Sequence, residues 1–358
     1  MSKRIEYIDI ARGIGILLVV LAHNDFGYVS EFGRKLIYSF HMPLFFFLSG
    51  YFLNVSLPFI EFLKKRFNSL LKPYLFTIFL IYFVSVSFNG MSFQTALQRI
   101  IKSLYGAGYY IDWVQLWFLP HLFAVSLYAF VFFAIVGRWN IRYVRWIVLV
   151  LTLGISSLFL KDFYPFNLSI FGKGYELFGL PFSIDLVLLS GFFFILGSEV
   201  RQASTEKTFE NIPLLIASGI AMVALVYFFD ALSDFNTRTF ESYFINTLEA
   251  VIGILFVLCL SRQIELRTKR LASLFKYFGQ ISLFILLFHV PIQGFWGQRI
   301  NGVTDNLTFS IWAGFVMGVA GSVLIHELFI KANPVALWWF GRDVKPQERK
   351  APASSGTM

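Results

Sequence analysis

Charged residues are scarce in this sequence. Asp, Glu, Lys and Arg together make up 14% of the chain, whereas a soluble domain carries about a quarter. Apolar residues reach 57% of the chain and gather in long runs. This balance excludes an ordinary soluble fold, and we interpret the chain as a polytopic membrane protein.

Cysteine is nearly absent as well. The single Cys259 lies within an apolar run and has no second cysteine to pair with. This excludes a disulfide framework, a CxxC motif and a thiolate metal site. We expect neither a metal ion nor a resident cofactor.

Ten apolar runs are long enough to cross a bilayer, which takes about twenty residues. They lie at residues 10–29, 36–56, 70–89, 114–136, 143–160, 180–199, 212–230, 244–261, 277–297 and 307–330. The first run has no small-residue cleavage site and holds charged residues, so we expect it to be retained rather than removed as a signal peptide. The sequence predicts an all-α membrane protein in which residues 1–332 form about ten transmembrane helices.

Lysine and arginine are distributed unevenly between alternate connecting segments. The set of segments that includes both termini holds 21 of these residues, and the other set holds 8. Because cytoplasmic segments carry the excess of positive charge, both termini are predicted to be cytoplasmic. The same asymmetry explains the net charge of +9 without a nucleic-acid partner.

Three further segments have distinct compositions. Residues 91–104 have apolar residues at helical spacing, which predicts a helix lying on the membrane. Residues 333–344 contain Trp338 and Trp339 and are predicted to be an interfacial segment. Residues 345–358 are rich in Pro, Ser and Lys, which predicts a disordered cytoplasmic tail.

The first apolar run carries ionisable residues on one face. Arg12 and His23 are eleven positions apart, which corresponds to roughly 1100° of helix rotation and about 16 Å along the axis. Asp9 lies one turn before Arg12 on the same side. Ionisable residues inside a span are costly and are functional candidates by default. The structural alternative is that His23 is a buried packing histidine bonded to a neighbouring helix.

The first fifty residues hold the most specific motifs. Ten residues separate Arg12 from His23, and the second run contains His41-Met-Pro-Leu-Phe-Phe-Phe-Leu-Ser-Gly-Tyr51. This pattern resembles the start of the acyltransferase 3 family, integral membrane enzymes that move acyl groups, mostly acetyl, onto cell-envelope glycans and other acceptors. The similarity extends over the whole predicted core, through the basic segment from Lys64 to Tyr74, Trp117-Phe-Leu, Phe194-Ile-Leu-Gly197 and the segment from Ser282 to Pro291.

Two positions depart from the family pattern. Ser69 stands where a second arginine of the basic segment is usual, and Leu286 stands where tyrosine is common before His289. Within the family, the chain is most similar to fucose 4-O-acetylase-like and surface-polysaccharide O-acetyltransferase members. The resemblance implies an O-acetyltransferase of the bacterial inner membrane that uses acetyl-CoA as co-substrate. Its partners would be membrane lipids, acyl-CoA and an envelope glycan or glycolipid.

Acyl transfer to a hydroxyl needs a base, two placed substrates and donors for the developing oxyanion. Among the five histidines, only His23 combines depth in the membrane with an arginine on its own helix face. Histidine also suits the proton step because its ordinary pKa lies near neutral pH. We therefore predict that His23 is the general base; a covalent acyl-histidine route is an open alternative. The carboxylate that would orient His23 must come from another helix.

The two substrates are assigned to opposite ends of the predicted bundle. Arginine pairs well with phosphate, so the predicted donor-binding residues are Arg12, Asp9, Arg66 and Lys72. The predicted acceptor-binding residues are His41, Trp117, His121 and His289. Each has a structural alternative: loop cations also set topology, a boundary tryptophan anchors at the interface, and a buried histidine satisfies backbone carbonyls.

A transporter or flippase is the alternative function. Arg12, His23 and Asp185, a carboxylate within the sixth run, would then form a proton or substrate path. Asp185 is also a possible partner for a histidine. The sequence shows no internal repeat and no matching pair of broken helices, the usual pointer to a secondary transporter.

Overall fold

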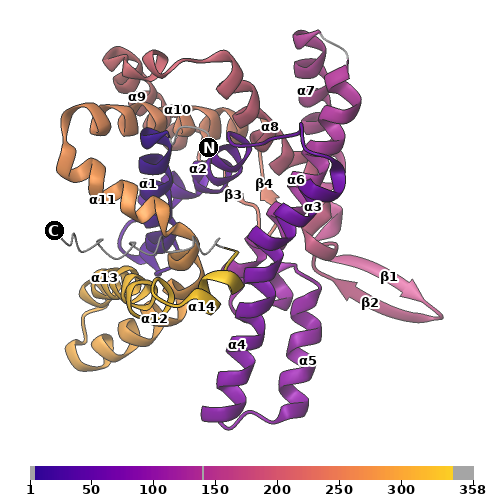
Figure 1. Cartoon of the computed structure of the whole chain (residues 1–358), viewed down its shortest axis with the longest axis vertical. Helices are drawn as coiled ribbons and strands as arrows, with labels where there is room; N and C mark the ends of the chain where they lie inside the picture. Colours follow the sequence, from indigo (N-terminus) through magenta and orange to yellow (C-terminus); the bar gives the residue numbers. More distant parts are fainter. Residues whose placement is uncertain (1–4, 139–140, 342–358) are drawn as a thin grey trace, which may run out of the picture.

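The computed structural model describes residues 5–138 and 141–341 (Figure 1). Its helices are α1 (Glu6–Ala22), α2 (Glu31–Gly50), α3 (Phe59–Arg66), α4 (Lys72–Phe88), α5 (Phe93–Leu104), α6 (Phe118–Ile135), α7 (Arg142–Phe159), α8 (Val187–Ala203), α9 (Ile212–Phe229), α10 (Tyr243–Arg267), α11 (Lys269–Gln280), α12 (Ser282–Thr304), α13 (Leu307–Ile325) and α14 (Pro334–Trp339). Three features of the sequence lie outside the described residues. They are the cationic residues at the extreme ends of the chain, residues 342–344 of the predicted interfacial segment and the predicted tail 345–358.

Most of the predicted spans have a counterpart in the structure. Seven helices or helix runs of the described part are long and apolar enough to cross a membrane, and they match the predicted third to eighth and tenth runs. The ninth run is a pair, α11 and α12, bent by 79° at Ile281, and counting it makes eight. The first two predicted runs correspond to α1 and α2. The chain is therefore a multi-pass, predominantly α-helical membrane protein.

Two short hairpins interrupt the helical architecture. Strand β1 (Phe166–Ile170) pairs antiparallel with β2 (Lys173–Leu177), and β3 (Ser233–Asp234) pairs antiparallel with β4 (Thr239–Phe240). Neither hairpin is among the elements expected from the sequence. Figure 1 shows β1 and β2 projecting away from the helices, whereas β3 and β4 lie among them.

Helix α1 differs from the predicted span 10–29. It has 17 residues, or about 25 Å of helix, which is less than the hydrocarbon core of about 30 Å. His23 is its C-cap, with φ −86° and ψ 9°. The chain then turns through a 3₁₀ segment, Phe26–Tyr28, into α2. The predicted span 10–29 is therefore wrong at its end: His23, which lies inside that run, is where the helix stops.

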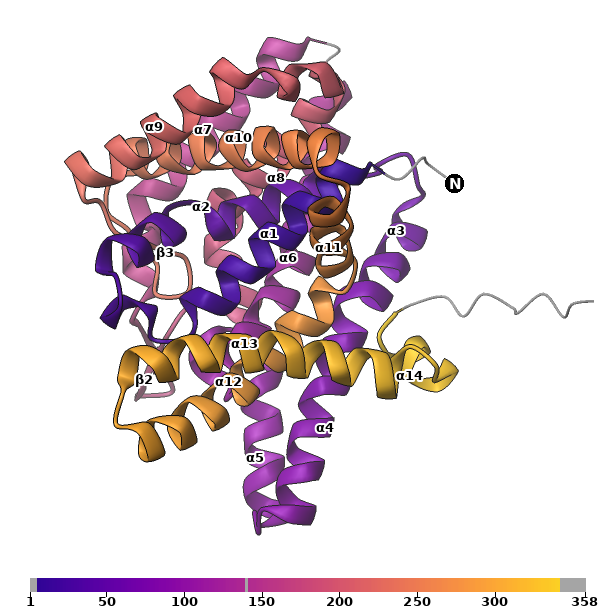
Figure 2. The same cartoon turned by 90° about the vertical axis from the view of Figure 1, so that its left-hand side faces the viewer.

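Glycines bring the central helices into backbone contact. A Cβ on Gly13 of α1 would collide with the carbonyl of Phe275 in α11, and a Cβ on Gly279 would collide with the carbonyl of Asp9. Figure 2 shows α1 and α11 side by side. Small residues permit this close approach of helices, so α1 is held directly against the backbone of α11.

Helices α2 and α8 are joined in the same reciprocal way. A Cβ on Gly50 would collide with the carbonyl of Phe194, and a Cβ on Gly197 would collide with the carbonyl of Phe47. Gly50 therefore permits close helix packing, the structural role that its position in the second run suggests. Helices α1 and α2 also contact each other, and both contact α10, so they form the centre of the bundle.

Helices α4 and α5 form a pair that projects from the rest of the molecule (Figures 1 and 2). Helix α5 matches the helix predicted at residues 91–104, and it packs on α4, where the hydroxyl of Tyr74 donates to the carbonyl of Ser103. Helix α14 also packs on α4 through Trp339, whose ring stacks 5.1 Å from that of Phe76.

Asp185 precedes α8 and is fully paired. Arg238 donates from Nε to Oδ2 of Asp185 at 2.8 Å and from Nη2 to Oδ1 at 3.1 Å, and both side chains are buried. Arg238 also donates to the carbonyl of Asn236 at 2.7 Å. Asp185 thus fixes the β3–β4 hairpin, which corrects the idea that its partner is a histidine.

The glycine contacts yield a stability prediction. We expect Gly50→Ala to destabilise the folded protein by about 1–3 kcal/mol, because the new methyl group collides with a backbone carbonyl that cannot swing away. The melting temperature of the detergent-solubilised protein, followed by size-exclusion chromatography, measures the change.

Gly154→Ala on α7 is the matched control, because nothing lies within 4 Å of a Cβ at that position. It should melt at or slightly above the wild-type temperature, since alanine favours helix over glycine. Equal melting temperatures for the two variants would contradict the packing interpretation.

Candidate active site

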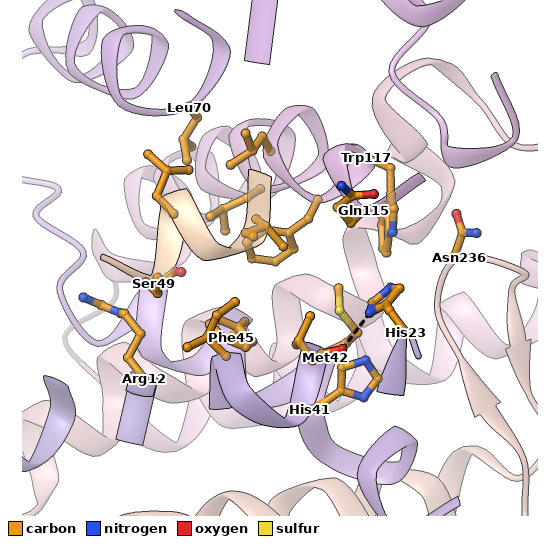
Figure 3. A pocket seen from close by; sticks show the side chains of 18 of the residues that line it. Arg12, His23, His41, Met42, Phe45, Ser49, Leu70, Gln115, Trp117 and Asn236 are labelled. Carbon is orange, nitrogen blue, oxygen red and sulfur yellow. Dashed lines mark hydrogen bonds between the residues drawn. The ribbon is translucent and has the colours of Figure 1, made fainter. Parts of the chain in front are cut away.

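One cavity of about 370 Å³ runs through the centre of the bundle. Figure 3 shows Arg12 and Ser49 at one end and His23, Trp117 and Asn236 at the other. Its walls come from α1, α2, α6, α11, α12 and the connecting segments before α4, before α6 and in the β3–β4 hairpin. The lining is largely apolar between the two ends, where Phe45 and Met42 form part of one wall.

Helix α1 supplies one side of this cavity. Arg12, Ile16, Val19 and His23 all line it, at spacings of three or four residues. Residues at these spacings share one face of an α-helix. The shared face expected for Arg12 and His23 is therefore present, and it faces an internal cavity.

Arg12 occupies the end of the cavity nearer the N-terminus of α1. Its guanidinium lies 3.8 Å from the carboxylate of Asp9 and 5.7 Å from the ring centroid of Phe52, and its side chain is 27% exposed. Ser49 of α2 and Ser69 line the same cavity. Ser69 belongs to a π-helical turn, Phe67–Leu71, a local distortion that is frequent at functional sites.

His23 has a defined orientation. Its Nδ1 lies 2.8 Å from the carbonyl oxygen of Val19. A carbonyl oxygen only accepts, so Nδ1 carries the hydrogen in this bond. The neutral ring therefore keeps its basic lone pair on Nε2. A backbone carbonyl fixes the ring, instead of the carboxylate that sequence reasoning expected from another helix.

Helices α12 and α13 hold the end of α1 in place. Gln293 of α12 donates to the carbonyl of His23 at 2.8 Å, and the side chain of Asn24 donates to the carbonyl of Ile311 in α13. Gly314 and Gly318 leave room for these two amides. The backbone on both sides of the imidazole is thus bonded to neighbouring helices.

Two of the four predicted acceptor residues line the cavity. His41 bonds through Nδ1 to the carbonyl of Ile37 at 2.9 Å and packs edge-on against Tyr38. Trp117 lines the same end of the cavity as His23 (Figure 3).

The other two predicted acceptor residues lie behind the cavity wall. His121 stacks on Trp117, and both of its ring nitrogens have partners, Phe182 and Ser190. The ring of His289 lies 5.5 Å from that of His23. Its Nδ1 donates to the carbonyl of Ile285, whereas its buried Nε2 has no hydrogen-bond partner among the described residues.

Three of the four predicted donor residues, Asp9, Arg66 and Lys72, lie outside the cavity lining. Arg66 lies over the rings of Phe62 and Phe194, and the Nζ of Lys72 lies 3.9 Å from the ring centroid of Trp338. Their part in donor binding stays a prediction.

Several polar residues of the cavity were missed by sequence reasoning, among them three that matter for the chemistry. Gln115, Asp234 and Asn236 line it together with His23. Gln115 donates to the carbonyl of Leu287 at 3.3 Å, and the backbone N–H of Asn236 donates to Asp234 at 2.9 Å. Neither hairpin residue shares a motif or a helix with His23. The sequence indicated these two hairpin residues only indirectly, through Asp185, a carboxylate in an apolar run. Its arginine partner, Arg238, holds the hairpin in place.

A second cavity, of about 530 Å³, lies beyond His23. It is lined by Ala22, His23, Asp25, Gly27, Tyr28, Glu31, Arg34 and Tyr38. His23 and Tyr38 border both cavities. The imidazole therefore stands between a space that leads to Arg12 and a more open space on the other side. Over residues 5–138 and 141–341, no group of three His, Cys, Asp or Glu side chains is arranged to hold a metal ion.

Comparison with known proteins identifies the family. A family model described as an acyltransferase domain, of the acyltransferase 3 type, matches residues 5–327, which is nearly the whole chain. No curated protein and no solved structure gives a significant match. The chain belongs to the acyltransferase 3 family.

Proposed function

We propose that this membrane acyltransferase moves an acetyl group from acetyl-CoA to a hydroxyl of an envelope glycan or glycolipid, with His23 as general base. The observation that carries the proposal is the position of His23 between two cavities, one of which also reaches Arg12. A donor and an acceptor entering from opposite sides would meet at the imidazole.

The arrangement of His23 suits direct transfer. The acceptor hydroxyl gives its proton to Nε2 while its oxygen attacks the thioester carbon. The carbon–sulfur bond then breaks, and the protonated imidazole returns the proton to the departing thiolate. The Nδ1 bond to Val19 stabilises the charged ring and keeps Nε2 in place throughout.

Arg12 is assigned to the phosphates of the donor. Positive charge is concentrated in the segments on the side of Arg12, so this end of the cavity is assigned to the cytoplasm, where acyl-CoA is made. The apolar middle of the cavity suits an extended acyl-carrying arm. We propose the inner membrane of a bacterium as the location of the enzyme, with the acceptor on the outer side.

The transporter alternative loses one of its three residues. Asp185 is buried against Arg238 and is not part of either cavity lining. Arg12 and His23 alone do not make a relay, because roughly 16 Å of helix separates them. Acetyl-CoA turnover by the purified protein separates the two functions.

The first functional prediction concerns His23. His23→Gln keeps a polar side chain of similar size but removes the base, so acetyl transfer should fall by about 10²–10⁴-fold. Release of the CoA thiol by protein in nanodiscs gives the rate, and mass spectrometry of envelope glycans from cells carrying each variant gives the product.

His326→Gln is the matched control, since His326 packs against Phe284 and lies outside both cavities. It should retain wild-type turnover. Full activity of a folded His23→Gln protein would remove the proposed base.

The second functional prediction concerns Arg12. Arg12→Lys should raise the KM for acetyl-CoA by about 10–100-fold, because lysine keeps the charge but loses the bidentate contact to phosphate. Arg99→Lys, on the exposed pair with Asp112, should leave that KM unchanged. A fall in kcat with an unchanged KM would show that Arg12 does not contact the donor.

The third functional prediction concerns the clamp at the end of α1. Gln293→Leu removes the bond to the carbonyl of His23 and should lower kcat by about tenfold while the KM for acetyl-CoA changes little. Stability should also fall, by about 1–3 kcal/mol, since a buried carbonyl loses its donor.

Gln263→Leu is a matched control because Gln263 also donates to a backbone carbonyl, that of Glu210, at 2.7 Å and away from both cavities. It should lose similar stability and keep its kcat. Equal kcat values for the two variants would show that the clamp is structural only.

A further inference from the structure

The end of the cavity around His23 is unusually rich in hydrogen-bond acceptors. Gln115 is 2% exposed, and its Nε2 is committed to the carbonyl of Leu287. That bond fixes the amide orientation, because a carbonyl cannot donate. The Oε1 of Gln115 is then left buried with no hydrogen-bond partner among the described residues.

Asp234 adds to this set from the other wall, where Asn236 also lines the cavity. Oδ1 of Asn236 is buried and packs against Gly108, outside the cavity lining, so it is not counted among the acceptors open to a ligand. Asp234 contributes a carboxylate, one oxygen of which accepts from the backbone of Asn236 at 2.9 Å. The hairpin that carries both residues is fixed by the buried Arg238.

A buried acceptor without a donor is costly, by about 1–3 kcal/mol. The acceptors of this region are therefore best satisfied by a ligand that brings several O–H donors. Trp117, whose ring stacks on His121, lines the same cavity and adds an aromatic surface to it. These features together describe a site for a polyhydroxylated ring.

The charges around His23 also discriminate between ligands, by their charge. Asp234 is the carboxylate of the central cavity lining, and its countercharge Arg12 lies at the other end. The outer cavity adds Asp25 and Glu31 against one cation of its lining, Arg34, although Glu31 is also paired with Lys35 at 3.1 Å. A carboxylate or phosphate on the ligand would lie beside the carboxylate of Asp234 and away from Arg12, and like charges repel each other.

We propose that Gln115 and Asp234 select the acceptor: an uncharged sugar ring with hydroxyls adjacent to the one that reacts, and no acidic group beside it. This inference rests on the proposed function for its acetyl-transfer step. Gln115 binds a neighbouring hydroxyl through Oε1, and Asp234 excludes anionic rings. Both residues are specificity-determining, and neither takes part in proton transfer.

The experiment uses two probes that differ only at C6 of the sugar, a hydroxymethyl group in dodecyl β-glucoside and a carboxylate in dodecyl β-glucuronide. Both are offered to the full-length protein in nanodiscs. Equilibrium binding of the tritiated probes and acetyl transfer from acetyl-CoA are measured separately. The wild type should bind and acetylate the glucoside about tenfold better than the glucuronide, as expected for one uncompensated charge.

The variants assign this preference to residues. Gln115→Met should weaken glucoside binding and raise its KM by about tenfold, with an unchanged KM for acetyl-CoA. Asp234→Asn should reduce the preference for the glucoside over the glucuronide to about threefold or less. Gln263→Met, which loses a comparable buried amide outside both cavities, should behave as the wild type toward both probes.

Three outcomes are distinguishable. Selective binding without acetyl transfer would preserve the acceptor site and overturn the proposed function. Acetyl transfer with equal use of the two probes, or a preference that Asp234→Asn leaves intact, would overturn the selection by charge. An unchanged glucoside KM in a folded Gln115→Met protein would remove Gln115 from the site, and Asp234→Asn tests the rest even if Gln115→Met does not fold.

Discussion

The structure depends on how a helix can end inside a membrane protein. Backbone groups that lose their helical partners there have little water to replace them, and each unsatisfied group costs several kcal/mol. At the end of α1, the carbonyl of Val19 accepts from both the backbone and the ring of His23, and the carbonyl of His23 accepts from Gln293. The bonds that allow the helix to stop are therefore the bonds that orient the imidazole.

Backbone contact between helices sets where that imidazole lies. The reciprocal glycine contacts join α1 to α11 and α2 to α8. Packed interiors adjust little to added volume, so these contacts fix the two helices that supply both ends of the cavity. The bend between α11 and α12 then brings α12 back beside α1, where Gln293 reaches His23.

The buried ion pair between Asp185 and Arg238 has a positioning role. Burying such a pair gives little net stability, because the loss of hydration offsets much of the attraction. Its geometry is nevertheless specific: Arg238 ties the segment before α8 to the β3–β4 hairpin and so places Asp234 and Asn236 in the cavity wall. The carboxylate of Asp185, which lies in an apolar run, therefore positions cavity residues without lining the cavity itself.

The sequence by itself determined what depends on local spacing and hydrophobicity. Run length predicted the membrane helices from α4 onward, and helical periodicity placed Arg12 and His23 on one face. Tertiary structure alone decided that α1 stops at Ala22, that Asp185 pairs with Arg238, and that Gln115 and Asp234 line the same cavity as His23. These features join residues up to about two hundred positions apart, and periodicity carries no information about such pairs because helix packing, not helix formation, brings them together.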